Sequence, residues 1–133
     1  MASGNLVTNN GRIIAMHRTF EVVPTMTAPL FFKVGTGTNT PSLNDTNLQT
    51  SITIGGSASK AIDSTYPAFD DAAIMATTRS VVNTTECNAN TITEFGLINS
   101  DGTPVLFSRA VFTGIVKTAS IQIVFIEKDQ VTN

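Results

Sequence analysis

The sequence predicts a mainly β protein, an antiparallel β-sandwich-like domain with one short N-terminal helix. Three observations support this fold class. The last third of the chain holds three β-rich runs, at residues 91–98, 105–112 and 120–127, joined by Gly-bearing connections. Thr is the commonest residue and only 14% of residues are charged, which suits strands with polar, hydrogen-bonding outer faces. Helical periodicity is clearest at residues 8–20.

Residues 8–20 are the expected helix. Thr8 or Asn9 can cap its N-terminus. The positions i, i+3, i+4 and i+7 form one apolar-leaning face, made by Ile13, Met16, His17 and Phe20. We therefore expect a short helix lying against a sheet. The β-sandwich-like core is expected over residues 30–128, and the whole chain, 1–133, as a single domain.

Between the helix and the last third, β-competent runs alternate with turn signals. Strands are expected at residues 30–34, 51–54 and 73–82. The segment from Ser57 to Asp63 is compatible with a further strand, and Tyr66-Pro67 favours a bend. The expected total is six to eight strands.

The last third predicts a three-stranded antiparallel meander. In its first hairpin we place Ile98 opposite Val105, with Asp101-Gly102 as the turn. Gly96 then faces Phe107, and Glu94 lies directly opposite Arg109. An opposite-charge pair across a ladder stabilises by roughly 0.2–1 kcal/mol and helps to fix the register. In the final strand both faces carry apolar residues, so we expect it to be central or to be covered by another subunit.

Composition and targeting signals exclude several classes of protein. The formal net charge of −2 provides no basic field, so neither nucleic acid nor an anionic membrane surface is an expected partner. The single cysteine, Cys87, cannot form an internal disulfide. The N-terminus lacks the pattern of a signal peptide, and we expect folding in a reducing cytoplasm. No apolar run approaches the ~20 residues of a membrane span.

No constellation of residues predicts catalysis. His17 has no companion metal ligand, and Cys87 has no activating base nearby. Gly35-Thr36-Gly37 superficially matches a dinucleotide loop, but a tight turn needing positive φ explains it better. Asp45 and Asp70-Asp71 could bind a cation, with solvated turn carboxylates as the default. We therefore expect no catalytic residues, no cofactor and no metal.

Several motifs, taken together, resemble those of tailed-bacteriophage virion proteins. They are Val-Gly-Thr-Gly-Thr at 34–38 and Pro-Ser-Leu-Asn-Asp-Thr-Asn-Leu at 41–48, then Glu-Phe-Gly-Leu-Ile at 94–98, Leu-Phe-Ser-Arg at 106–109 and Lys117. The opening Leu-Val-Thr-Asn-Asn-Gly-Arg at 6–12 is similar to the start of such proteins. The resemblance marks a motif loop, with Gly35, Thr36, Gly37 and Asp45 as its members.

The resemblance implies a non-enzymatic structural protein of a tail, collar, baseplate or fibre attachment. It implies self-association, as a trimer or ring, and contacts with other virion proteins. The location would be the virion, assembled in the host cytoplasm. The alternatives are a capsid decoration (cement) protein that stabilises the head, and a receptor- or carbohydrate-binding module. An enzyme is the remaining alternative, which is disfavoured because the sequence has no recognisable set of catalytic residues.

Overall fold

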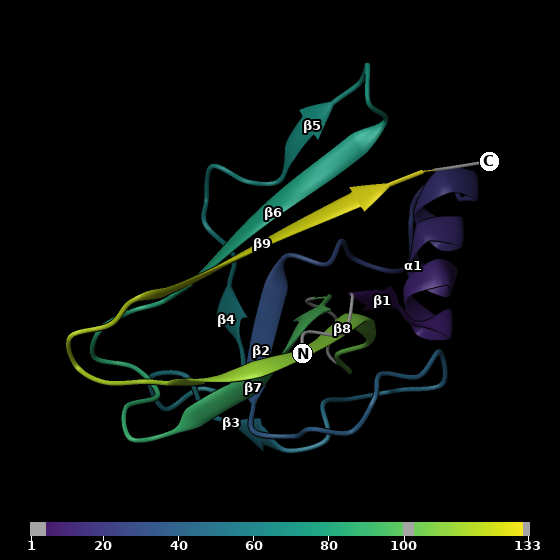
Figure 1. The fold of residues 1–133 in the computed structure, drawn as a ribbon. Helices are drawn as coiled ribbons and strands as arrows, with labels where there is room; N and C mark the ends of the chain where they lie inside the picture. The colour runs from purple at the N-terminus through teal and green to yellow at the C-terminus, as the bar shows by residue number, and fades with distance from the viewer. Residues whose placement is uncertain (1–4, 100–102, 132–133) are drawn as a thin grey trace.

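The computed structural model describes residues 5–99 and 103–131 of the chain. Two antiparallel sheets pack face to face, so the predicted fold class is confirmed. The larger sheet has the strand order β1-β8-β7-β2-β3, with β4 also paired to β2, and the smaller has the order β5-β6-β9. One helix, α1, stands at the side of the sandwich in the part of the chain that the structure describes (Figure 1).

Nine strands lie among the described residues, against the six to eight expected. The runs predicted at 30–34, 51–54 and 73–82 form β2, β3 and β6. The elements are β1 (Leu6–Val7), α1 (Asn9–Phe20), β2 (Phe31–Gly35), β3 (Ser51–Ile52), β4 (Lys60–Ala61), β5 (Ala68–Asp70), β6 (Met75–Val82), β7 (Thr91–Ile98), β8 (Leu106–Val116) and β9 (Ile123–Gln130).

The main core lies between the two sheets and is centred on phenylalanine rings. Phe95 stacks on Phe125 with ring centroids 4.6 Å apart, so β7 of one sheet touches β9 of the other. Phe32 and Phe112 extend the cluster, at 5.9 Å from Phe95 and 5.6 Å from Phe125. Buried aliphatic residues complete the core: Val34, Ile54, Ile62, Val82, Ile92, Leu97 and Ile123.

The β7–β8 hairpin forms, but the predicted register is wrong by two residues. Glu94 pairs with Val111, and Gly96 pairs with Arg109. The shift has two parts. Ile98 pairs with Leu106 and not with Val105, which accounts for one residue, and Phe107 is a β-bulge between Leu106 and Ser108, which accounts for the second. The hairpin closes at Asn99, whose backbone N donates to the Val105 carbonyl at 3.2 Å. The predicted turn at Asp101-Gly102 lies outside the described residues.

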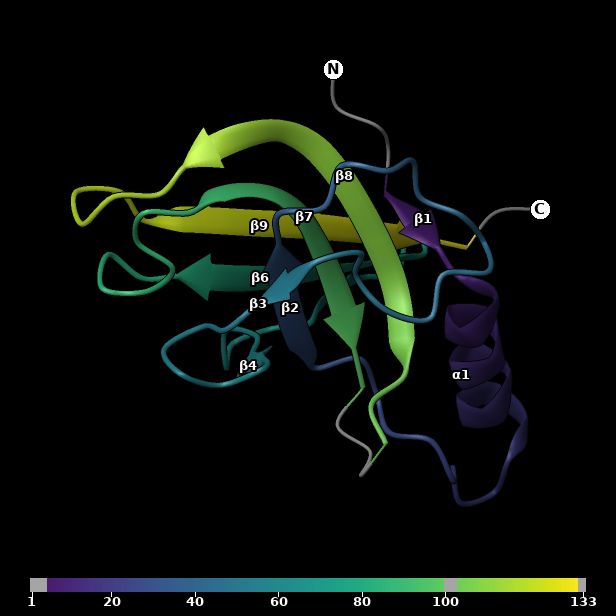
Figure 2. The same cartoon turned by 90° about the horizontal axis from the view of Figure 1, so that it is seen from below.

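The predicted three-stranded meander is wrong, because β9 belongs to the other sheet. It pairs with β6 along eight residue pairs, from Met75↔Gln130 to Val82↔Ile123. On its other edge β8 pairs with β1, through Leu6↔Arg109 and Val7↔Ser108. Figure 2 shows β7 and β8 arching together while β9 runs beside β6. β9 is an edge strand of the smaller sheet, so the prediction of a central strand is wrong. Val124 and Ile126, on its second apolar face, are exposed.

A buried lysine holds the crossing between the sheets. The Lys117 ammonium donates to Asn88 Oδ1 at 2.8 Å, to the Thr118 carbonyl at 2.9 Å and to the Thr84 carbonyl at 3.2 Å. Its own backbone N donates to the Asn90 carbonyl at 2.8 Å. The end of β8 is thereby tied to the connection between β6 and β7.

The helix begins where predicted, but it buries a different face. Thr8 caps it by accepting from Gly11 N at 3.0 Å, and the same hydroxyl donates to the Leu106 carbonyl at 2.7 Å. A Cβ on Gly11 would lie 2.1 Å from the Phe107 carbonyl oxygen, so only glycine lets the helix approach β8 this closely. Gly11 and Ile14 are the buried helical residues. The predicted face is exposed instead at Ile13, Met16 and Phe20.

Candidate functional site

Glu94 and Arg109 form a buried ion pair on the outer face of the larger sheet. The arginine donates to Glu94 Oε2 from Nε at 3.0 Å and from Nη2 at 2.9 Å. The Glu94 side chain is 0% exposed and that of Arg109 is 1% exposed. The two predicted residues are therefore together, as diagonal neighbours rather than directly opposite. The segment 36–50 covers them.

The Glu94 carboxylate also anchors that covering segment. Its Oε1 accepts from the backbone N of Thr50 at 2.7 Å and of Gly37 at 3.0 Å, and its Oε2 accepts from Gln49 N at 3.0 Å. With the two arginine donors it accepts five hydrogen bonds. A carboxylate surrounded in this way is held as a fixed acceptor.

Arg109 extends the network to the far side of the segment. Nη1 donates to Asp45 Oδ2 at 2.9 Å, and Nη2 donates to the carbonyl and side-chain oxygens of Asn39. Asp45 Oδ2 accepts in addition from Ser42 N at 2.9 Å. The Asp45 carboxylate therefore has an ion-pair partner and a backbone N–H donor within the protein, and its position here requires no bound metal cation.

The motif-loop glycines are required by close contacts with the covering segment and with this carboxylate. The atom nearest to an added Cβ is the Thr50 carbonyl oxygen, at 2.3 Å, for Gly35 and Gln49 Cβ, at 2.5 Å, for Gly37. A Cβ on Gly35 would lie 2.5 Å from Glu94 Oε1, and one on Gly37 would lie 2.6 Å from the same atom. Neither glycine has a positive φ, so the tight-turn explanation for them was wrong. Thr36 between them donates its backbone N to the Thr50 carbonyl at 3.0 Å. We name Gly35, Gly37, Asn39, Asp45, Glu94 and Arg109 the loop-anchoring network.

The loop-anchoring network is suited to structure rather than to reaction. Both Glu94 oxygens are enclosed by donors, and the charged groups face one another instead of an open cleft. An acid–base catalyst needs at least one proton-transfer partner within reach of a substrate. These contacts hold the fifteen-residue segment 36–50 against the outer face of the larger sheet.

The other residues weighed for chemistry have local partners. His17 Nδ1 lies 2.6 Å from Glu21 Oε1 in an i,i+4 pair. The Cys87 thiol donates to the Thr53 carbonyl at 3.3 Å, and burial, with Glu86 second, raises the pKa of the thiol. Asp70 accepts from Ala73 N at 3.1 Å, and Asp71 is exposed. Within residues 5–99 and 103–131, no three His, Cys, Asp or Glu side chains cluster as metal ligands.

An exposed apolar surface covers the outer side of α1 and the segment after it. We define the α1 apolar surface by Ile13, Met16, Phe20, Val22 and Val23. Phe20 is 81% exposed, and Val22 is fully exposed. In both overall views α1 lies beside the sandwich and not between its sheets (Figures 1 and 2).

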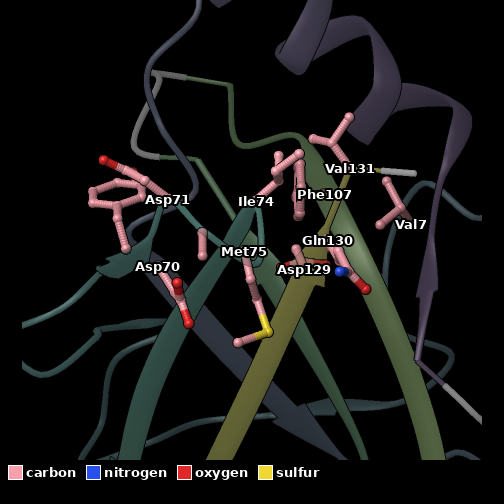
Figure 3. Close-up of a pocket in the computed structure, with 11 residues that line it drawn as sticks. Val7, Asp70, Asp71, Ile74, Met75, Phe107, Asp129, Gln130 and Val131 are labelled. Atoms are coloured by element: carbon pink, nitrogen blue, oxygen red, sulfur yellow. The ribbon is translucent and has the colours of Figure 1, made fainter. Parts of the chain in front are cut away.

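A pocket of about 490 Å³ opens at the end of the sandwich where β1 and β8 meet β6 and β9 (Figure 3). Its lining is largely apolar, with Val7, Phe107 and Met75 among the contributing side chains. The carboxylate-bearing residues of the lining are Asp70, Asp71 and Asp129.

The sequence-based prediction missed Asp129, which lines this pocket, and Glu127, which lines a second, smaller hollow beside β8 and β9. Glu127 is 5% exposed and so is one of the buried charged residues. The signal was present in the sequence: the apolar alternation of Ile123 and Phe125 places Glu127 next on the same face of the strand.

Comparison with protein-family models, with curated proteins and with solved structures finds no match to this chain. In the part of the chain that the structure describes, no helix has the length and apolar character that crossing a bilayer requires.

Proposed function

We propose that this chain is a non-enzymatic structural component of a tailed-phage virion, at the tail, collar, baseplate or a fibre attachment. It acts through self-association and through contacts with other virion proteins. The observation that carries the proposal is the α1 apolar surface, which lies outside the protein's own core.

An apolar surface of this kind favours a protein partner. Single exposed apolar residues are normal, but contiguous ones mark interaction sites. Ile13, Met16 and Phe20 share one helical face, and Val22 and Val23 follow within three residues. Complete burial of one such side chain contributes about 1.5–3 kcal/mol. A second copy that covers this surface would stabilise an assembly in which each α1 contacts another.

The outer face of β9 supports the same proposal. Val124 and Ile126 are exposed on an edge strand of the smaller sheet. An exposed apolar edge strand is a template for pairing with another chain. Two apolar surfaces on different sides of one subunit suit a ring or a longer array.

The loop-anchoring network supports a rigid building block. The motifs that resemble those of phage virion proteins include Gly35, Gly37, Asp45, Glu94 and Arg109, and all five meet in this network. These residues hold a surface segment in one conformation. A subunit with a fixed surface can make the same contacts with each of its neighbours, which supports the proposal. None of these residues needs a substrate to explain it.

Light scattering on the purified chain tests self-association. We expect an oligomer whose mass is a multiple of three, five or six subunits. The double variant Phe20→Ser with Val22→Ser should dissociate it to monomers. The matched control, Val131→Ser, removes an exposed valine outside the α1 apolar surface and should leave the oligomer intact. A wild-type chain that stays monomeric at high concentration and binds no virion protein would overturn the proposal.

Copy number on the particle tests the location. Quantitative gel densitometry of virions should find a small multiple of three, five or six copies, and gold labelling should mark the tail. Hundreds of copies spread over the head would instead identify a capsid decoration protein. Binding to a glycan array at micromolar strength would identify a receptor-binding module.

A further inference from the structure

One end of the sandwich has a polar interior. Four buried residues there have side-chain oxygen atoms that form no hydrogen bond of regular geometry with any described residue: Thr78, Ser80, Ser108 and Glu127. Both carboxylate oxygens of Glu127 are among them. Buried polar groups are normally satisfied. Ser108, Asn5 and Asp129 lie close enough to act on the Glu127 carboxyl, but none of them forms a hydrogen bond of regular geometry with it, so these five oxygens need an explanation.

The strand registers bring these oxygens together. Thr78 on β6 pairs directly with Glu127 on β9, and Asp129 lies two residues further on the same face. Directly paired residues have Cβ atoms about 4.5–5.5 Å apart. Ser108 faces them from the larger sheet, since it pairs with the core residue Leu97. The Asn5 side chain lies beside Glu127 as well.

Among residues 5–99 and 103–131, no basic side chain balances the two carboxylates. Burial, with Asp129 second, raises the pKa of Glu127 to about 8, and burial also raises the pKa of Asp129. The groups that face Glu127 from β6, β8 and the N-terminal segment are hydroxyls and an amide. Lys128, between the two acids, faces the opposite side of the sheet, where it is exposed.

We propose that Asn5, Thr78, Ser108, Glu127 and Asp129 form a binding site for a divalent cation of the calcium class. All of their candidate donors are oxygen atoms: two carboxylates, two hydroxyls and one amide. Calcium takes six to eight oxygen ligands in flexible geometry, whereas zinc prefers nitrogen and sulfur. Magnesium demands a near-ideal octahedron and retains its waters, so it suits this buried set less well.

The site has routes to solvent on two sides. Asp129 lines the pocket at the end of the sandwich, where Figure 3 shows it between Met75 and Gln130. Glu127 and Asn5 line a second, smaller hollow of about 160 Å³ beside β8 and β9. An ion could therefore reach the carboxylates without separation of the sheets.

A bound ion would join both sheets and the N-terminal segment at one point. Its ligands come from β6 and β9 in the smaller sheet, from β8 in the larger, and from Asn5 just before β1.

Calorimetric titration of CaCl₂ into the chelator-treated chain at pH 7.5 tests the proposal. We expect one ion per chain. The thermal midpoint should rise by roughly 5–10 °C at a calcium concentration one hundred times the dissociation constant. Glu127→Gln and Asp129→Asn should each weaken binding at least tenfold. Asp71→Asn removes an exposed carboxylate at the same end and should bind normally.

Three results would overturn the proposal. Wild-type chain that shows neither heat of binding nor a midpoint shift has no such site. Undiminished binding by Glu127→Gln would place the ion on the surface. Stabilisation by lower pH alone, with no response to calcium, would mean that a shared proton and no metal ion satisfies the two acids. All of these are measured on the isolated chain and do not depend on whether it belongs to a virion.

Discussion

Replacement of Arg109 by methionine removes the central cation of the loop-anchoring network while keeping most of the side-chain volume. The arginine bonds to Glu94, Asp45 and Asn39. Without it, Glu94 remains as a fully buried charge, still held by three backbone N–H donors. Loss of one partner of a buried pair costs about 3–5 kcal/mol. Because those three donors stay, we expect a loss near the lower end, about 3 kcal/mol.

Urea unfolding followed by circular dichroism measures this loss. For a slope of about 1–3 kcal/mol per molar, the midpoint should fall by roughly 1–3 M. The control is Arg79→Met, since Arg79 is 33% exposed and pairs with Asp63 at the surface. That variant should lose less than about 1 kcal/mol.

Neutralisation of Glu94 tests the electrostatic cause. Glu94→Gln in the Arg109→Met background removes the fully buried charge. It leaves only Asp45 without its cation, and that side chain is 19% exposed and keeps the Ser42 N–H donor. The double variant should therefore be more stable than the sum of the two single losses predicts. A loss below about 0.5 kcal/mol for Arg109→Met, or one equal to that of the Arg79→Met control, would refute the reasoning.

Three further predictions concern other sites. Gly37→Ala should lose about 1–3 kcal/mol in the same urea assay, because the added Cβ would lie 2.6 Å from Glu94 Oε1; a loss below ~0.5 kcal/mol would contradict this contact. In calcium-free buffer, stability should fall as pH rises from about 4.5 to about 8, by up to about 1.4 kcal/mol per unit, because the folded state keeps the Glu127 proton longer than the unfolded chain does. Glu127→Gln should flatten this slope, and an unchanged slope would assign it to other groups. Cys87 should react with iodoacetamide at pH 8 more slowly than glutathione does, because its pKa is raised; equal rates would show an unhindered, ordinary thiol.

The elements that could be predicted from sequence are those with a pattern of their own. β7 has an apolar β-branched run with turn signals on both sides, and α1 has a threonine cap. β1, β4 and β5 have only two or three residues each. They are strands because β8, β2 and β6 present backbone groups to them, so no local pattern marks them.

The division of strands between the sheets could not be predicted, since it depends on competition for edges. Adjacency in the sequence favoured β9 as the neighbour of β8. In the structure the two residues of β1 lie at that edge, and β9 pairs with β6. The same limitation applies to the helix, whose buried side is chosen by the contact of Gly11 with β8 and not by its most apolar face.

The candidate site was predictable in part. Opposite charges on neighbouring strands indicated the Glu94–Arg109 pair, whereas the bulge at Phe107 shifted the register by an amount that no pattern revealed. The need for glycine at 35 and 37 depends in part on a carboxylate more than fifty residues away. Likewise, Glu127 is buried because a second sheet covers it, which only the assembled sandwich defines.

The cap of α1 has a consequence for the order of events during folding. The Thr8 hydroxyl bonds to Leu106, 98 residues later, and its backbone N bonds to Phe107. A twelve-residue helix is marginal by itself in water. During synthesis, therefore, the cap of α1 cannot form its contacts until β8, the last strand but one, has been made. Nascent chains that end before β8 should leave the N-terminal quarter open to proteases, and β8 is the element whose arrival closes it.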